Sequence, residues 1–269
     1  MAQEADSHRI EAFRQMVLQK ERIEKRLSTI KTRVAIYSGK GGVGKTTITV
    51  NLACVLAKQG KLVGILDADI DCPNVVRMMK ASNTLSVDDD RIIPAEAYGI
   101  KIVSMAFLQP GNEDEAIVWR GPLIHKAITE LLEGTDWGDL DYLLVDLPPG
   151  TSDAPLTIMQ SLPLDGFVIV TTPQELARLD AKRSINMIRK MGITVLGGVE
   201  NFTGDVFGAA SSPQEFASQM GIPYLGAIAM RSDYSRSPGP AALHSEAVRK
   251  EYETLASQLE KRLARKPKS

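Results

Sequence analysis

The loop at residues 39–47 constrains this chain more than any other feature. It reads Gly-Lys-Gly-Gly-Val-Gly-Lys-Thr-Thr and directly follows an apolar run at residues 34–37. The pattern G-x-x-x-x-G-K-[ST] between a strand and a helix is typical of a phosphate-binding loop. Glycines let successive N–H groups point inward, and a helix beginning near Gly44 adds the positive end of its dipole. We therefore expect a strand–loop–helix unit that holds phosphate groups.

Each loop residue is assigned to nucleotide binding: Gly39, Lys40, Gly41, Gly42, Val43, Gly44, Lys45, Thr46 and Thr47. We expect Lys45 to reach the β- and γ-phosphates, Thr46 to ligate Mg²⁺, and Thr47 to lie by the α-phosphate. The alternative is a glycine-rich turn without a ligand. We disfavour it because a lysine pointing into a nest of amide protons is unfavourable without an anion.

Short apolar runs alternate with helical stretches along most of the chain. The predicted strands are residues 34–37, 62–66, 100–105, 142–145, 167–171, 194–199 and 224–228. This rhythm is typical of βαβ units with a buried parallel sheet. With 269 residues, we expect an α/β fold: a single doubly wound, mostly parallel sheet of the P-loop NTPase type.

Both ends of the chain are predicted to be helical. Ile10, Phe13, Val17, Ile23 and Leu27 recur at helical spacing within residues 8–31. We divide the chain into an N-terminal helical extension, residues 1–31, and a P-loop domain, residues 32–269. Within that domain, residues 232–240 are predicted to be a loop, and residues 241–265 a closing helix with leucines along one side.

Three aspartates follow predicted strands. Asp67 and Asp69 come after one strand, and Asp146 ends another. Ligands of open parallel sheets bind beyond the carboxyl ends of the strands, so these carboxylates should converge on the loop. Asp146 is predicted to hold Mg²⁺ through water. For Asp69 we favour a role in the site, whereas Asp67 fits a loop-capping carboxylate as well as a functional one.

Charge and cysteine content narrow the possible partners. Outside the basic ends, residues 32–246 hold 18 basic and 25 acidic side chains, so we expect no bulk nucleic-acid binding. The polar N-terminus and the lack of a long apolar run predict a cytoplasmic protein without membrane association. Two cysteines, Cys54 and Cys72, cannot form a disulfide framework or an ordinary zinc site within one chain. Cys54 is predicted to be a small core residue.

A wider set of motifs resembles the Mrp/ApbC branch of the MinD-like P-loop ATPases. Lys40 makes the loop a deviant Walker A motif, and further matching segments include Trp119-Arg120-Gly121-Pro122. The matching segments are residues 38–51, 64–69, 119–122, 137–142, 146–150, 156–157 with Gln160, 171–175 and 199–201. The resemblance implies an ATPase that works as a homodimer with nucleotide sandwiched between the subunits.

The same resemblance assigns roles to individual residues. Lys40 of one subunit would contact phosphate bound by the other, and Asp69 would orient the attacking water. Asn201 matches the asparagine that reads the edge of adenine. The catalytic set that it implies is therefore Lys40, Lys45 and Asp69.

Two departures from the family pattern affect its cargo and its base. Cluster-carrying members have a Cys-x-x-Cys pair after the asparagine strand, but residues 201–210 here contain no cysteine. Because such clusters need thiolate ligands, we expect no iron–sulfur cluster held in the usual way. Two copies of Cys72 in a dimer remain a possible shared metal ligand pair. Arg231 also stands where the family more often has aspartate, which leaves selection of the base open.

The leading hypothesis is a Mg-ATP hydrolysing homodimer that binds and releases an unidentified protein partner. The alternative is a MinD- or ParA-like positioning ATPase that acts at a membrane or on DNA, for which the closing helix would be the surface-binding tail. A small-molecule kinase is a more distant hypothesis, because no separate acceptor pocket is evident in the sequence.

Overall fold

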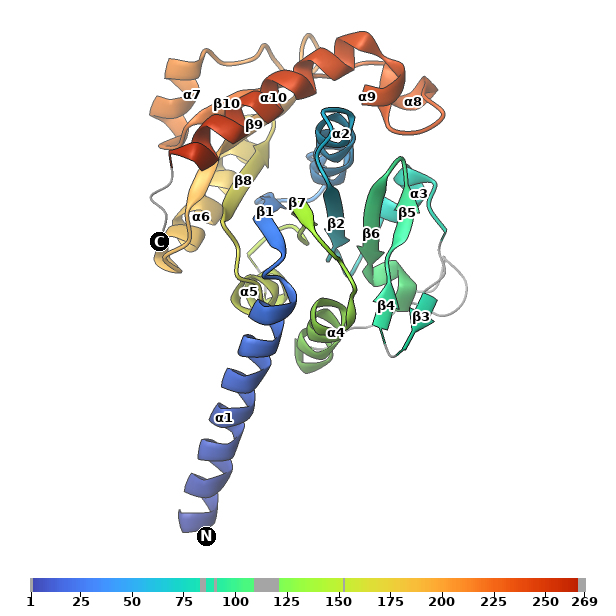
Figure 1. Ribbon diagram of the computed structural model, residues 1–269. Helices are drawn as coiled ribbons and strands as arrows, with labels where there is room; N and C mark the ends of the chain where they lie inside the picture. Colours follow the sequence, from blue (N-terminus) through green and yellow to red (C-terminus); the bar gives the residue numbers. More distant parts are fainter. Residues whose placement is uncertain (1, 83–85, 90, 109–120, 152, 266–269) are drawn as a thin grey trace.

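The computed structural model describes residues 2–82, 86–89, 91–108, 121–151 and 153–265. At its centre lies an eight-stranded sheet in the order β10-β9-β8-β1-β7-β2-β6-β5 (Figure 1). Its neighbouring strands are parallel except for β5 and β6, which are antiparallel. The strands are β1 (Ile30–Tyr37), β2 (Val63–Asp67), β5 (Ala95–Ala97), β6 (Ile100–Ser104), β7 (Leu140–Asp146), β8 (Gly166–Thr171), β9 (Val195–Thr203) and β10 (Tyr224–Ala229).

Helices cover both faces of this sheet (Figure 1). One face packs against α2 (Lys45–Lys58), α3 (Val75–Met79), α9 (Ala241–His244) and α10 (Glu246–Ala264). The other packs against α4 (Gly121–Gly134), α5 (Asp153–Ser161), α6 (Glu175–Lys190) and α7 (Pro213–Met220). Strands covered on both faces read as continuous apolar runs, and all of β8 is buried. The predicted doubly wound, mostly parallel sheet is confirmed.

Smaller elements complete the described chain. A hairpin of β3 (Ser86–Asp88) and β4 (Arg91–Ile93) lies beside the sheet as a separate antiparallel pair. A 3₁₀ turn, η1 (Met105–Leu108), follows β6, and α8 (Asp233–Arg236) lies within the segment predicted to be a loop. The predicted strands missed this hairpin and β5, because three-residue strands carry too little periodicity to detect.

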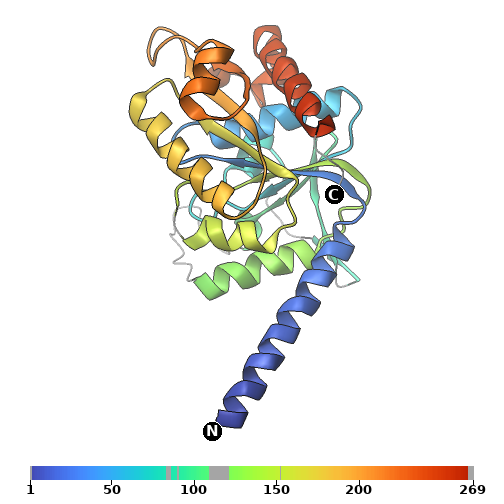
Figure 2. The same ribbon diagram turned by 90° about the vertical axis from the view of Figure 1, so that its left-hand side faces the viewer.

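The N-terminal helix α1 (Ala2–Arg26) projects away from the sheet (Figures 1 and 2). It ends earlier than the helix predicted over residues 8–31, because Ile30 already pairs with β7. Ile23 and Leu27 are buried in the core, whereas Val17 is exposed. The predicted apolar side chains Ile10 and Phe13 lie outside the described side chains. The division of the chain at residue 31 stays a prediction.

The C-terminal segment is two helices rather than the single helix predicted over residues 241–265. The backbone of Ser245 is extended between α9 and α10, and its hydroxyl accepts a hydrogen bond from the N–H of Val248. Ser245 therefore caps a new helix instead of continuing the old one.

No helix among the described residues combines the length and the apolar character needed to cross a bilayer. Leu255 and Leu259 of α10 are buried in the core. The matching motif residues Trp119 and Arg120 lie outside the described residues.

Candidate functional site

The glycine-rich loop lies between the end of β1 and the first turn of α2. Gly44, at the start of α2, adopts a left-handed backbone conformation with φ of 83°, which residues with a Cβ rarely adopt. A Cβ at Gly44 would also collide with the side chains of Asn201 and Phe202. The loop therefore needs glycine here for both its backbone conformation and its close contact with β9.

Lys45 is a buried cation held by two carboxylates from neighbouring strands. Its side chain is 6% exposed, and its Nζ lies 3.0 Å from Asp146 Oδ1 and 3.3 Å from Asp69 Oδ2. Burial lowers the pKa of Lys45, but the negative charges of Asp146 and Asp69 more than offset this and raise it above its ordinary value. Lys45 is therefore a permanent positive charge at this edge of the sheet.

Asp146 accepts hydrogen bonds from two threonine hydroxyls in addition to its ion pair with Lys45. Thr46 Oγ1 donates to Asp146 Oδ2 at 2.6 Å, and Thr49 Oγ1 donates to Asp146 Oδ1 at 3.0 Å. The hydroxyl of Thr46 and the carboxylate of Asp146 thus form an oxygen pair of the kind that Mg²⁺ prefers. The sequence analysis missed Thr49, although it stands one helical turn after Lys45 and faces the same side.

Asp67 lies opposite Asp146 in the β2–β7 register and supports the loops around the site. Its carboxylate is fully buried and accepts hydrogen bonds from the N–H of Val75, the hydroxyl of Ser104 and the N–H of Asp69. Burial, followed by the charge of Asp146, raises the pKa of Asp67. These contacts are those of a loop-capping carboxylate, the structural alternative that the sequence left open.

Asp69 faces Lys45 from the loop after β2. One of its oxygens contacts Lys45 Nζ, and the other accepts a hydrogen bond from the N–H of Cys72 at 3.3 Å. Burial raises the pKa of Asp69, while the charge of Lys45 opposes that rise. The structure thus brings Asp69, Asp146, Lys45 and Thr46 together, as the strand-end argument predicted.

Asn201 lies near the end of β9 and braces the loop directly. Its side chain is buried, and Nδ2 donates to the carbonyl of Val43 at 2.8 Å. Sequence reasoning assigned Asn201 only to the base, so this contact with the loop is an additional finding. It ties the position of the loop to the strand on the far side of β8.

Lys40 differs from Lys45 in its surroundings. It is only half-buried, and its side chain pairs with no carboxylate among the described residues. Its carbonyl accepts a hydrogen bond from the Ser38 hydroxyl, and the Ser38 carbonyl accepts one from the N–H of Gly150. The Tyr37 hydroxyl donates to the carbonyl of Gly150. The backbone around Lys40 is therefore fastened to the loop after β7, while its ammonium group stays uncommitted.

A buried ion pair beside the site was not predicted. Arg178 of α6 lies 2.6 Å from Glu200 Oε1, and the Glu200 side chain is fully buried. The other oxygen of Glu200 accepts from the N–H of Ser211 at 2.7 Å. This pair fixes the segment after β9 to α6, and no short sequence pattern links residues so far apart.

That segment is the one in which the family pattern has its cysteines. Gly204 and Gly208 exchange backbone hydrogen bonds to close a short turn, and Val206 at its tip is 75% exposed. Phe202 and Phe207 pack ring against ring beneath it. Residues 202–208 thus form a closed turn that contains no cysteine and offers only Thr203 and Asp205 as side-chain oxygen donors where a cluster would need thiolates.

The two cysteines lie in contrasting places. Cys54 is buried in α2, as predicted, and burial raises its pKa to about 12. Cys72 is exposed in the loop after β2. Within the described part of the chain, no three His, Cys, Asp or Glu side chains gather in a way that could hold a metal ion.

Comparison with known proteins gives a consistent result. A family model described as ParA, NUBPL iron-transfer P-loop NTPase, matches residues 29–264. An iron–sulfur cluster carrier protein of Methanocaldococcus jannaschii is 44% identical over 223 residues, which are 78% of this chain and 76% of the relative. Its counterpart in Deinococcus radiodurans is 41% identical over 254 residues, 87% of this chain and 71% of that relative.

Solved structures agree with this match. A nucleotide-binding protein from Archaeoglobus fulgidus in complex with ADP shares 39% identity, with a TM-score of 0.69 over 83% of this chain and 90% of the other. MinD from Pyrococcus furiosus shares 22% identity, with a TM-score of 0.64 over 86% of this chain and 99% of the other. At that identity the second likeness concerns the fold alone.

Proposed function

Because this chain belongs to the ParA/NUBPL family of iron-transfer P-loop NTPases and is an ATPase, we propose that it is a homodimeric switch driven by Mg-ATP. One observation carries the proposal: a buried lysine, a threonine hydroxyl and two strand-end carboxylates meet at one edge of the sheet. In this arrangement ATP and water give ADP and phosphate.

Residues of the loop and of the neighbouring strand ends divide this work. The Lys45 ammonium neutralises charge on the β- and γ-phosphates, which is the main requirement of phosphoryl transfer. Thr46 and, through water, Asp146 would hold Mg²⁺, which would supply further positive charge at the phosphate oxygens. Asp69 accepts a hydrogen bond from the attacking water and orients it.

Lys40 supplies the link between subunits. Its uncommitted ammonium suits a contact with phosphate held by a second copy, so that ATP is sandwiched between two chains. This role supplies a cation across an interface, as arginine fingers do in other P-loop enzymes. Dimerisation then depends on the γ-phosphate and ends after hydrolysis.

Recognition of the base rests on Asn201 in this proposal. Arg231, the family departure near the same end of the sheet, is held by Glu251 at 2.7 Å. Since that ion pair occupies the guanidinium, we assign no contact with the base to Arg231.

We further propose that the nucleotide cycle binds and releases a protein partner without a cluster held by the usual cysteine pair. The curated relatives are named iron–sulfur cluster carrier proteins. This chain has a closed, cysteine-free turn at the position of the pair. The described part of α10 does not favour the alternative role at a membrane or on DNA, because Leu255 and Leu259 are buried in the core.

Two lysine variants test the proposal. Lys45→Ala should abolish binding of both ADP and ATP. Lys40→Ala should leave ADP binding intact and reduce ATP-dependent dimerisation and hydrolysis. Lys58→Ala, which removes an exposed lysine at the end of α2, is the matched control and should behave as wild type.

Calorimetry, light scattering and phosphate release measure the three properties. Nucleotide at about 100 times Kd should raise the free energy of unfolding of the wild type by about 2.7 kcal/mol. If nucleotide does not change the free energy of unfolding of the wild type, the proposed binding site is overturned. If light scattering gives the same molecular mass with ATP, with ADP and without nucleotide, the proposed ATP-dependent dimer is overturned.

A further inference from the structure

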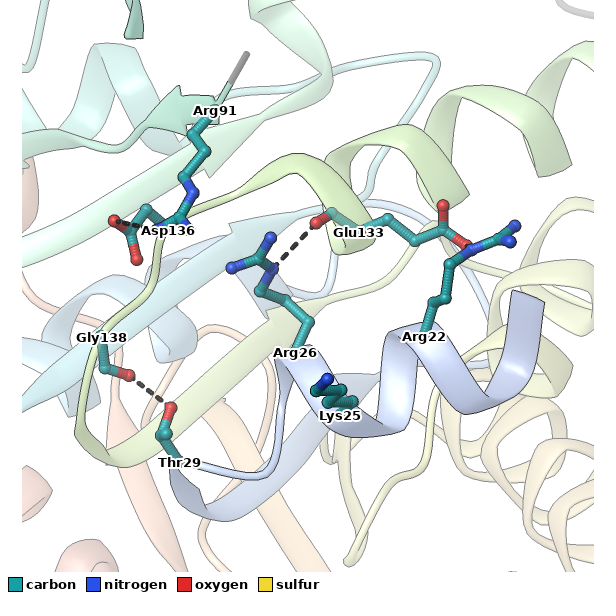
Figure 3. Close-up of a pocket in the computed structure, with 8 residues that line it drawn as sticks. All are labelled: Arg22, Lys25, Arg26, Thr29, Arg91, Glu133, Asp136 and Gly138. Atoms are coloured by element: carbon teal, nitrogen blue, oxygen red, sulfur yellow. Dashed lines mark hydrogen bonds and ion pairs between the residues drawn. The ribbon is translucent and has the colours of Figure 1, made fainter. Parts of the chain in front are cut away.

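A groove of about 560 Å³ lies at the edge of the sheet opposite the phosphate-binding loop. It is bounded by the last turns of α1, the end of α4, strand β4 and the segment that leads into β7 (Figure 3). Thr29 and Gly138, which precede β1 and β7, form its floor, whereas the loop follows the other end of β1. The groove is therefore separate from the nucleotide site. Its volume is within the range of small-ligand sites.

The groove is lined mainly by cations. Its charged side chains are Arg22, Lys25, Arg26, Arg91, Glu133 and Asp136. Four cations thus face two carboxylates, and three of the four come from the basic N-terminal helix α1. The groove therefore carries a net positive charge.

Both carboxylates are already partnered, and two of the cations are not. Arg22 Nε lies 3.4 Å from Glu133 Oε1, and Arg91 Nη1 lies 3.4 Å from Asp136 Oδ2. Lys25 pairs with no side chain among the described residues. Arg26 donates only through Nε, to the carbonyl of Glu133 at 3.0 Å, which leaves both terminal nitrogens of its guanidinium available.

The walls of the groove are fixed by buried contacts. Ile23 and Leu27 anchor the end of α1 in the core, on either side of Lys25 and Arg26. Thr29 Oγ1 donates to the carbonyl of Gly138 at 2.7 Å, and the N–H of Asp136 donates to the carbonyl of Ile92. The backbone that carries Lys25 and Arg26 is therefore already held in place before a ligand binds.

We propose that this groove binds a small oxyanion, a dicarboxylate or a phosphate, through Lys25 and the terminal nitrogens of Arg26. Guanidinium groups present paired donors that match the oxygens of carboxylates and phosphates. The exposed pairs of Arg22 and Arg91 are of the kind that contributes little to stability, so both arginines can turn to the ligand. The donors left unpaired belong to two consecutive residues, Lys25 and Arg26, which favours a compact ligand over an extended nucleic-acid backbone.

Binding at this place joins α1 to the body of the protein. Arg22, Lys25 and Arg26 come from α1, whereas Arg91 comes from β4. A bound anion bridges the two, and the end of the projecting helix becomes more firmly attached. Amide hydrogen exchange in residues 22–29 should therefore slow when the ligand is present.

Calorimetric titration of the full chain, saturated with Mg-ADP to fill the loop, tests the proposal with succinate and with inorganic phosphate as separate probes. The double variant Lys25→Gln/Arg26→Gln should weaken binding at least tenfold. Arg91→Gln alters the opposite wall and should weaken binding independently of α1. Lys20→Gln removes one exposed charge from the same helix outside the groove and should leave binding unchanged.

Thermal unfolding of each variant confirms that it is folded before titration. The site is supported if succinate, phosphate or both bind to the wild type, slow amide exchange in residues 22–29, and bind more weakly to the groove variants. Which of the two probes binds identifies the ligand class. If neither succinate nor phosphate binds at millimolar concentrations, the proposed site is overturned. Binding that survives in both the double variant and Arg91→Gln also overturns it.

Discussion

A single lysine holds together the acidic edge of the nucleotide site. Asp67, Asp69 and Asp146 converge there, and Lys45 contacts the last two directly. Carboxylates at such short range repel one another, and after burial the charge of Asp146 contributes to the raised pKa of both Asp67 and Asp69. The charge of Lys45 offsets this repulsion for Asp69. Lys45, which we propose to bind phosphate, is thus also the counterion of the folded site.

The raised pKa of Asp67 makes the stability of the nucleotide-free protein depend on pH. Burial and the charge of Asp146 raise this pKa in the folded state, whereas in the unfolded chain it stays near the ordinary value of about 4. Above pH 4 the folded state therefore binds more protons at this position. Its contribution to stability is lost as the pH rises from about 4 through the raised pKa.

Asp67→Asn removes this titration and should flatten the pH dependence. Between pH 5 and pH 7.5, wild type should lose at least about 1 kcal/mol of unfolding free energy relative to the variant. Urea unfolding without nucleotide measures both. Asp139→Asn, an exposed position, is the control and should follow wild type. Parallel curves for wild type and Asp67→Asn would contradict the assignment.

At the scale of elements, the loop depends on its contact with α6. A Cβ at Gly39 would overlap the backbone of Asp180 and Ala181 in that helix, so the helix can approach only because residue 39 is glycine. The first glycine of the motif is therefore required for packing against α6, in addition to its proposed role in phosphate binding.

Gly39→Ala should lower the free energy of unfolding by about 2 to 3 kcal/mol, because backbone atoms of α6 must move. Gly42→Ala is the comparison: a Cβ there meets no atom within 4 Å, and only its φ of 76° opposes the change. That strain costs about 1 kcal/mol. Denaturant unfolding without nucleotide measures the loss of unfolding free energy in each variant. Equal losses in Gly39→Ala and Gly42→Ala would show that contact with α6 is not the reason for glycine at residue 39.

Strand β9, the segment after it and α6 are joined by the buried pair of Arg178 and Glu200. Arg178→Ala leaves a fully buried carboxylate without its cation, so unfolding free energy should fall by about 3 to 5 kcal/mol. Arg183→Ala removes an exposed pair with Asp180 from the same helix and should cost less than about 1 kcal/mol. Urea unfolding compares the two variants. A similar loss of unfolding free energy in both would contradict the claim that the buried ion pair matters more to stability than the exposed one.

For the whole molecule, the sheet order brings the functional groups to one edge and leaves the basic groove at the other. The loop follows β1, and the three carboxylates follow β2 and β7, which flank one another in the sheet. The cysteine-free turn after β9 lies on the same edge, beyond β8.

The arrangement of cysteines predicts that no stable iron–sulfur cluster assembles on the proposed dimer. Burial keeps Cys54 protonated and out of reach. Two copies of Cys72 supply only two thiolates, whereas such clusters normally take about four protein ligands. After anaerobic reconstitution with iron and sulfide, gel filtration should remove the thiolate-to-iron absorbance. Retained absorbance that disappears in Cys72→Ser would overturn this expectation.

Local sequence patterns were sufficient for the central part of this protein. The loop at residues 39–47 predicts strand, turn and helix at once, since its pattern of glycines, lysine and threonine is typical of that arrangement. Continuous apolar runs marked the long strands because a doubly covered sheet buries both faces of each strand. Asp69 and Asp146 could be placed together from sequence, because all parallel strands end at the same edge.

Tertiary contacts decided what those patterns left open. The helix α1 ends at Arg26 because Ile30 pairs with β7, more than one hundred residues away. Asp67 is a loop-capping residue because Val75 and Ser104 donate to it from two other segments. The Arg178–Glu200 pair, the contact of Gly39 with α6 and the basic groove likewise join distant parts of the chain. No local period encodes such contacts, because they exist only once the sheet has assembled.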